Sequence, residues 1–269
     1  FYYPPEPMHT NSLGFRTDLM LAACDGEVVS GPRYIAARTP ACPQFWWGNF
    51  VLFDEPPPPG AGEHWEAVFD REVGCVPGIR HRNLAWDAID GSQGDAQSFV
   101  ARGYALTENV FLTANETRPT AHDRADLDVR PLNTDAQWLA ALIIAQRSFD
   151  ASASFQAFQE QQMRRQRALV NRGVGQWFGA FRGDDMVATM GLFVREGLGR
   201  CQGVATAPEH RRQGCCSTLL HGVCSHGFAQ MGAEQIVIMT AADNAAARVY
   251  ESVGFQQSER VSSLSMATL

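Results

Sequence analysis

The stretch that most constrains the fold of this chain covers residues 208–216 and reads Pro-Glu-His-Arg-Arg-Gln-Gly-Cys-Cys. An alternating strand precedes it, and a helix with one apolar face follows it. The first N–H groups of a helix lack internal partners and carry partial positive charge. A glycine and two arginines at such a helix start favour a site for phosphate groups. The alternative is an exposed turn with solvated arginines.

Hydrophobic periodicity predicts a regular series of strands and helices around this loop. The predicted strands cover residues 127–132, 176–182, 186–195, 200–207, 236–239 and 261–266. The predicted helices begin at Thr134 or Asp135, cover 154–170, run from Cys216 to about Met231, and cover 245–252. In the first of these helices, the expected apolar residues are Trp138, Leu139, Leu142 and Ile143. The three consecutive strands from residue 176 to 207 form an antiparallel meander.

The length of 269 residues favours two domains. Residues 113–125 are polar and lack apolar periodicity, so the domains are predicted to be 1–120 and 121–269. The first domain repeats the closing part of the second in weaker form. Residues 99–104 align with residues 250–255, and a strand, a helix and a strand precede each segment. We therefore predict a duplication.

The net charge of −7 and the sequence pI of about 5.5 argue against a nucleic-acid partner. No apolar run approaches the roughly 20 residues that span a bilayer, and residues 1–8 do not resemble a signal peptide. Seven cysteines in an irregular pattern are expected to be free thiols, and His221, Cys224 and His226 lack metal-site spacing. We expect no membrane partner, no metal and a cytoplasmic location. An address before Phe1 stays open, because the sequence does not begin with methionine.

Two segments carry a resemblance to a known family. Residues 204–220 resemble the acetyl-CoA-binding motif of the GCN5-related N-acetyltransferase (GNAT) superfamily, in which a strand and a proline precede Arg/Gln-x-x-Gly-x-Gly/Ala. Arg211, Gly214 and Cys216 hold those three places. Residues 243–255 resemble the later Asn, Ala, Tyr and Gly-Phe signature. The resemblance covers about residues 126–269. It implies an α/β fold with a mixed, mostly antiparallel central sheet flanked by helices, and two such domains in tandem.

Two positions depart from the family pattern. Cys216 replaces the usual Gly or Ala, which adds a thiol beside the phosphate path. The usual Asn position, counted back from Tyr250, is Asp243, whereas the asparagine of this chain is Asn244.

The resemblance implies acetyl-CoA as the cofactor and direct transfer of its acetyl group to an amine. The residues expected to bind the cofactor are Val204, Ala205, Thr206, Arg211, Arg212, Gln213, Gly214, Cys215, Cys216, Ser217, Asn244 and Tyr250. Tyr250 would protonate the departing thiolate. The candidate bases are Glu196, Glu209 and His210, of which none stands out; Glu209 is selected for the site, although Glu209 and His210 could instead be solvated loop residues. Tyr250 could instead simply pack over the helix end, and Cys215 or Cys216 could act as an acyl-carrying nucleophile.

The predicted function is N-acetyltransfer to a primary amine of a small molecule or peptide, by a monomer or homodimer. The alternatives are a mycothiol-synthase-like acetyltransferase and a non-catalytic acyl-CoA-binding regulatory module. The first domain has Asp-Glu-Pro-Pro-Pro-Pro-Gly at residues 54–60 where a phosphate loop would lie. Acidic residues repel a diphosphate and prolines lack N–H donors, so we predict that this half binds no coenzyme A. Its aromatic residues 45–50 are expected either in a core strand or in a wall of the acceptor site.

Overall fold

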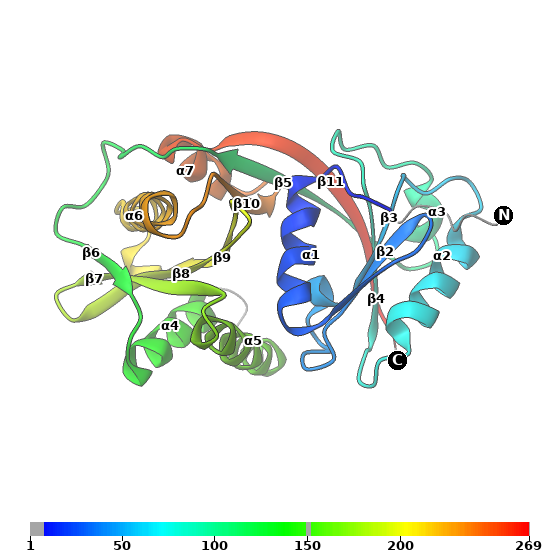
Figure 1. The fold of residues 1–269 in the computed structure, drawn as a ribbon, viewed down its shortest axis with the longest axis horizontal. Helices are drawn as coiled ribbons and strands as arrows, with labels where there is room; N and C mark the ends of the chain where they lie inside the picture. Colours follow the sequence, from blue (N-terminus) through cyan, green and yellow to red (C-terminus); the bar gives the residue numbers. More distant parts are fainter. Residues whose placement is uncertain (1–7, 149–151, 269) are drawn as a thin grey trace. The chain divides into compact units, whose positions relative to one another are not determined.

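The computed structural model describes residues 8–148 and 152–268 of the chain (Figure 1). The chain forms two compact units. Unit 1 comprises Phe1–Phe111, Thr240–Asp243 and Ser258–Leu269, and unit 2 comprises Leu112–Met239 and Asn244–Gln257. The last strand is thus counted with unit 1. Within the described ranges, no helix combines the length and the apolar character needed to cross a membrane.

Unit 1 is built on a sheet with strand order β1-β2-β3-β4-β11-β5. Its elements are α1 (Leu13–Asp25), β1 (Glu27–Ser30), β2 (Tyr34–Arg38), η1 (Trp46–Gly48), β3 (Phe50–Phe53), α2 (Gly62–Phe69), η2 (Asp70–Gly74), β4 (His81–Trp86), α3 (Ala96–Val100), most of β5 (Ala105–Ala114) and most of β11 (Gln256–Ala267). β3 and β4 are parallel, whereas β1–β2, β2–β3 and β4–β11 are antiparallel.

Aromatic side chains fill the core of unit 1. The ring of Phe53 on β3 stacks on Trp65 of α2, with centroids 3.8 Å apart, and Trp65 also contacts Trp86 and Phe99. These side chains are almost fully buried, and burying one large aromatic side chain contributes about 2–3 kcal/mol. Of the aromatic residues 45–50, Trp46 and Trp47 lie in the short helix η1, and only Phe50 begins a strand.

Unit 2 has the strand order β10-β9-β8-β7-β6. Its elements are β6 (Asp128–Pro131), α4 (Asp135–Ser148), α5 (Ala153–Asn171), β7 (Gly175–Arg182), β8 (Asp185–Arg195), β9 (Leu198–Thr206), η3 (Pro208–His210), α6 (Cys215–Gln230), most of β10 (Gln235–Ala241) and α7 (Ala246–Val253). β9 and β10 are parallel, and the remaining pairs are antiparallel. α6 covers one face of these strands, and α4 and α5 cover the other (Figure 1). The sheet is therefore mixed and mostly antiparallel, which confirms the predicted fold class.

Small residues let α6 approach the sheet closely. A Cβ added at Gly222 would lie 3.1 Å from the Val129 side chain, and one at Gly227 would lie 2.5 Å from Leu192. Leu219, Leu220, Val223 and Cys224 on the same helix are fully buried. The predicted apolar face of α6 thus lies against the strands and fixes the position of its N-terminus.

The buried face of α4 differs from the prediction. Trp138 is buried as expected, but Leu139 and Ile143 are 57% and 44% exposed. The buried positions are instead Trp138, Ala141, Ile144 and Ala145. The prediction was wrong because both faces of this helix carry apolar residues, so the helical period alone does not identify the buried one.

The ladder between β9 and β10 ends at Arg200, the third residue of β9. Their parallel ladder covers only three residue pairs, from Gln235–Leu198 to Val237–Arg200. A β-bulge interrupts the pairing of β9 with β8 at Gly203, whose φ of +59° lies in the left-handed region. Among the described residues, positions 201–206 of β9 therefore have no ladder partner on the edge that faces β10, while Cys201, Gln202, Ala205 and Thr206 pair with β8.

The two units repeat one order of elements. In unit 1, β3, α2 and the parallel strand β4 precede α3, as β9, α6 and β10 precede α7. A glycine of positive φ follows each helix: Gly254 (+119°) is the C-cap of α7, and Gly103 (+97°) ends the turn after α3. The next residue donates its N–H across the helix end at 3.1 Å in each, from Tyr104 to Phe99 and from Phe255 to Tyr250. The sequence alignment of the two halves therefore has a structural counterpart.

Candidate cofactor site and active site

The turn before α6 leaves backbone donors without partners. Arg212 and Gly214 have φ values of +56° and +80°, and Gly214 is the N-cap residue of α6. Glycine has no side-chain oxygen to cap the helix. The hydroxyls of Ser217 and Thr218 donate to the Gly214 carbonyl instead, at 2.9 and 2.8 Å. In the part of the chain that the structure describes, the N–H groups of residues 214–217 have no acceptor, so they remain available to an anion.

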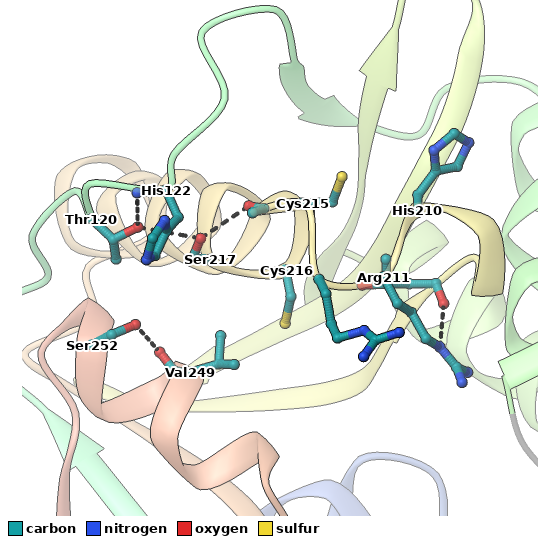
Figure 2. Close-up of a pocket in the computed structure, with 12 residues that line it drawn as sticks. Thr120, His122, His210, Arg211, Cys215, Cys216, Ser217, Val249 and Ser252 are labelled. Atoms are coloured by element: carbon teal, nitrogen blue, oxygen red, sulfur yellow. Dashed lines mark hydrogen bonds between the residues drawn. The ribbon is translucent and has the colours of Figure 1, made fainter.

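These donors lie at a cavity of about 330 Å³. Its walls come from the segment before β6, the end of β9 with the following loop, the first turn of α6, and α7 (Figure 2). The lining residues are Thr120, His122, Thr206, His210, Arg211, Arg212, Gly214, Cys215, Cys216, Ser217, Val249 and Ser252. All of them belong to unit 2.

The cavity is basic in an acidic chain. None of its 12 lining residues is an aspartate or glutamate, although the chain carries a net charge of −7. Arg212 has neither an ion pair nor a side-chain hydrogen bond within the described ranges, so its guanidinium is free to bind an anion. Arg211 is engaged: its Nη2 donates to the Ser148 carbonyl at 2.9 Å, and its Nε donates to the Thr206 carbonyl at 3.4 Å. Of the two arginines predicted to bind phosphate, Arg212 is the freer.

The open edge of β9 continues from this cavity. Thr206 at the end of β9 lines the cavity, while the side chain of Ala205 packs with Ile144 and Ala207 in the core. Ala205 can therefore contribute only its backbone groups on the open edge, whereas the Val204 side chain is half-buried. Free main-chain donors, a partner-free arginine and an unpaired strand edge fit the diphosphate and amide-containing arm of coenzyme A.

Tyr250 of α7 is buried near two thiols. Its side chain is 6% exposed and lies near Cys216 and Cys201, although Tyr250 is not among the residues that line the cavity. Burial, followed by these thiols, raises the pKa of Tyr250 above its ordinary value. The phenol thus stays protonated at neutral pH, as a proton donor must.

The thiols at the start of α6 do not favour a nucleophilic role. Burial raises the pKa of Cys216 to about 11, and Cys215 adds to this shift. Burial also raises the pKa of Cys215, despite the opposing effect of Arg182 and Arg124. Because the thiolate is the nucleophilic form of cysteine, these shifts oppose covalent catalysis at neutral pH.

The predicted base candidates lie in different places. Glu209 forms a two-pronged ion pair with Arg147 of α4 at 3.0 and 2.9 Å, and its own backbone and Arg147 lower its pKa. His210 lies 3.5 Å from Arg182, between Nδ1 and Nη1. Glu196 occupies the β8–β9 turn, at the opposite end of β9 from the cavity. Among the described residues, none of these three side chains forms a hydrogen bond with Tyr250.

Two further predicted cofactor residues make local contacts. The Asn244 Oδ1 accepts a hydrogen bond from the Ala246 N–H at 2.9 Å at the start of α7. The Gln213 Nε2 donates to the Glu209 carbonyl at 2.8 Å. Neither residue is among those that line the cavity. Gln213 does line a second cavity of about 750 Å³, together with Arg212 and Gly214.

The sequence interpretation missed four lining residues: Thr120, His122, Val249 and Ser252. Thr120 and His122 lie in the polar segment 113–125, whose sequence indicates only a domain boundary. Val249 and Ser252 neighbour Tyr250 on α7, so the helical period around that tyrosine was the available signal. The segment that contains Thr120 and His122 has no helical or strand period, so its sequence gives no signal of this kind.

Comparisons with known proteins agree with this geometry. Residues 138–255 match the model of the acetyltransferase (GNAT) family. No curated protein matches the sequence of the chain. The fold resembles that of a GCN5-related N-acetyltransferase from Kribbella flavida, with a TM-score of 0.65 and 15% identity over 96% of each chain.

Two other solved structures resemble the chain over nearly its whole length. One is a functionally unknown conserved protein from Staphylococcus epidermidis ATCC 12228, with a TM-score of 0.73 and 10% identity over 91% of this chain and 96% of that one. The other is a tandem GNAT protein from the clavulanic acid biosynthesis pathway, with a TM-score of 0.53 and 13% identity over 97% of each chain. At such identities these likenesses show the fold alone. Residues 138–255 therefore belong to the acetyltransferase (GNAT) family, and the chain has the fold of GCN5-related N-acetyltransferases in tandem.

Proposed function

We propose that residues 121–269 transfer an acetyl group from acetyl-CoA to a primary amine of a small molecule or peptide, with both substrates bound together. The observation that carries this proposal is the basic cavity at the start of α6, with its four N–H groups that lack acceptors among the described residues. We also propose that residues 1–120 form a degenerate copy that binds no coenzyme A.

In this proposal, the N–H groups of residues 214–217 and the Arg212 guanidinium hold the diphosphate. The backbone of Val204, Ala205 and Thr206 on the open edge of β9 holds the pantetheine arm. Acetyl-CoA bound there would supply a thioester carbonyl that an amine can attack. The Val204 N–H is the proposed donor to the carbonyl oxygen, where negative charge develops in the reaction.

Tyr250 Oη is the proposed donor of the proton that the leaving thiolate takes. Its raised pKa keeps that proton in place until it is needed. Glu209 is retained as the side chain to test as the acceptor of the amine proton. Its ion pair with Arg147 lowers its pKa and so weakens it as a base, and turnover equal to wild type in Glu209→Gln would remove it.

The test combines binding and turnover. Calorimetry measures acetyl-CoA binding, and a thiol reagent then measures coenzyme A release with a panel of amines: a polyamine, an amino sugar, a thiol-bearing amino sugar and a lysine peptide. We expect release with at least one amine, and for Tyr250→Phe unchanged binding with transfer about a hundredfold slower. Binding without release for any amine would favour the non-catalytic module, and no binding would overturn the proposal.

Selective release with the thiol-bearing amino sugar would identify the mycothiol-synthase-like alternative. Unaltered turnover in Tyr250→Phe would remove that residue from the mechanism.

A further inference from the structure

The segment from residue 116 to 126, here called the strap, lies against the start of α6 and the end of α7. The Arg118 N–H donates to the Val253 carbonyl at 2.8 Å, and the Arg124 N–H donates to the Thr218 hydroxyl at 2.8 Å. Between them, the Thr120 hydroxyl lies 3.4 Å from that of Ser217. The strap is therefore fastened at both ends and at its centre, although it contains neither helix nor strand.

The closest approach of the strap is to Gly214. A Cβ at that position would lie 1.8 Å from the His122 carbonyl oxygen, a distance that no side chain tolerates. The glycine therefore has two roles: it adopts a φ of +80°, and it leaves room for the strap. This contact places residues 120–122 directly beside the free N–H groups of α6.

An ion-pair network fixes the far end of the strap. Asp126 accepts from the Arg124 Nε and the Arg182 Nε, both at 2.9 Å. These arginines lower the pKa of Asp126 to about 2, so the network persists throughout the neutral range. Because Arg182 lies at the end of β7, the strap is tied to the sheet as well as to α6.

The strap brings two polar side chains to the cavity. Thr120 and His122 both line it, and Figure 2 shows them beside Ser217, on the other side of the first turn of α6 from Arg211 and His210. The Thr120 hydroxyl also donates to the Asp123 carboxylate at 2.8 Å and accepts from the His122 N–H at 3.1 Å, which holds this part of the strap in a tight turn. A hydroxyl and an imidazole are both groups that bind phosphate oxygens.

We infer that Thr120 and His122 are further ligands of the cofactor diphosphate, so the strap forms the second wall of the site that the Arg212 loop begins. This inference rests on the proposed function, because it assigns residues to the same cofactor. It adds that nucleotide binding depends on the segment that joins the two halves of the sequence.

The test measures the affinity of the full chain for coenzyme A and for 3′-dephospho-coenzyme A by calorimetry. We expect His122→Ala to weaken binding of both ligands about tenfold, and Thr120→Val about threefold. His64→Ala is the matched control, since His64 is an exposed histidine on α2, and it should bind as the wild type does. Melting curves of the unliganded variants reveal any loosening of the strap.

The outcomes are distinct. If the wild type binds neither ligand, the proposed function fails and the inference fails with it. If the wild type binds and His122→Ala binds equally well, the inference alone is overturned. A loss confined to coenzyme A would assign His122 to the 3′-phosphate and overturn the diphosphate assignment.

A second measurement does not depend on how the variants fold. In wild-type protein with isotope-labelled histidine, the ring signals of His122 should shift on addition of 3′-dephospho-coenzyme A, while those of His64 should not. Unshifted His122 signals in a sample that binds the ligand would contradict the inference.

Discussion

The starts of α2 and α6 occupy the same place in the two repeats, yet their chemistry is opposite. A glycine of nearly equal φ precedes each helix: Gly214 (+80°) is the N-cap of α6, and Gly60 (+79°) lies one residue before the N-cap of α2. Before α2, prolines occupy residues 56–59 and have no N–H to offer. The Pro57 carbonyl accepts from the Asp95 N–H at 2.7 Å, and Arg33 pairs with both Asp54 and Glu55. Position in the fold therefore does not decide whether a helix start can bind phosphate, whereas free donors and a cavity lining without acidic residues favour the proposed site at α6.

In unit 1, a carboxylate of the unit itself accepts hydrogen bonds from the N–H groups at the start of α1, the longest helix described there. The buried Glu259 accepts from the Ser12 hydroxyl at 2.5 Å and from the N–H groups of Leu13 and Gly14 at 2.6 and 3.3 Å. The donors that an external anion would use at α1 are thus already satisfied within unit 1. In unit 2, the corresponding donors of α6 lack such a partner among the described residues.

The largest expected difference between the two loops comes from adding one methyl group. Gly214→Ala should weaken acetyl-CoA binding by about two orders of magnitude or more, because the new Cβ meets the His122 carbonyl and disfavours the positive φ. Gly60→Ala is the matched control: it carries the same φ cost, but nothing lies within 4 Å of its Cβ. Calorimetry on both variants checks this, and equal binding by the two would erase the distinction between the loops.

Removing the charge of the Glu259 carboxylate at the start of α1 should lower the stability of the protein. Glu259→Gln should lower the free energy of unfolding by about 2–3 kcal/mol, because it removes a charged acceptor from three donors, two of them in buried hydrogen bonds. Urea unfolding measures the loss. Glu55→Gln, at an exposed ion pair, should stay within about 0.5 kcal/mol of the wild type. Similar losses in both variants would show that Glu259 is no stronger an anchor than a surface carboxylate.

The two arginines beside the loops should respond differently to removal. Arg212→Ala should weaken acetyl-CoA binding about tenfold, since it deletes a charge-assisted contact to phosphate. Arg33→Ala removes an arginine that already has two carboxylate partners, so binding should not change. Titration calorimetry at low and high salt separates the two effects. If the Arg212 variant binds acetyl-CoA with wild-type affinity, Arg212 does not contribute to binding and the main-chain N–H groups remain the proposed diphosphate ligands.

The smallest effect concerns thiol labelling. Because its pKa is raised to about 11, Cys216 stays a thiol at neutral pH and becomes a thiolate only as the pH approaches that value. Labelling of Cys216 by iodoacetamide should therefore be slow at pH 7, rise towards pH 11, and be slowed by acetyl-CoA. The exposed Cys75 of unit 1 serves as the reference, and acetyl-CoA should not protect it. Equal protection at both cysteines would indicate a general effect of the ligand.

Much of the site could be predicted from sequence because it depends on one local pattern. A proline, two arginines and a glycine between a strand and a helix are sufficient to predict the open helix start, and α6 begins at Cys215, one residue from its predicted start. The strap could not be predicted, since its contacts with Thr218 and Val253 leave no periodicity in residues 116–126. The freedom of Arg212 and the engagement of Arg211 also depend on distant carbonyls, such as that of Ser148, which the sequence does not place.

The pairing of β11 has a consequence for how this chain reaches its folded state. Ser263 to Ala267 form an antiparallel ladder with β4, so the sheet of unit 1 lacks one of its inner strands until the ribosome has delivered residues more than 170 positions downstream. The N-terminal half therefore cannot complete its sheet during synthesis before the C-terminal strand β11 has been made. A fragment that ends near residue 120 would expose the unpaired edge of β4 and so invite aggregation.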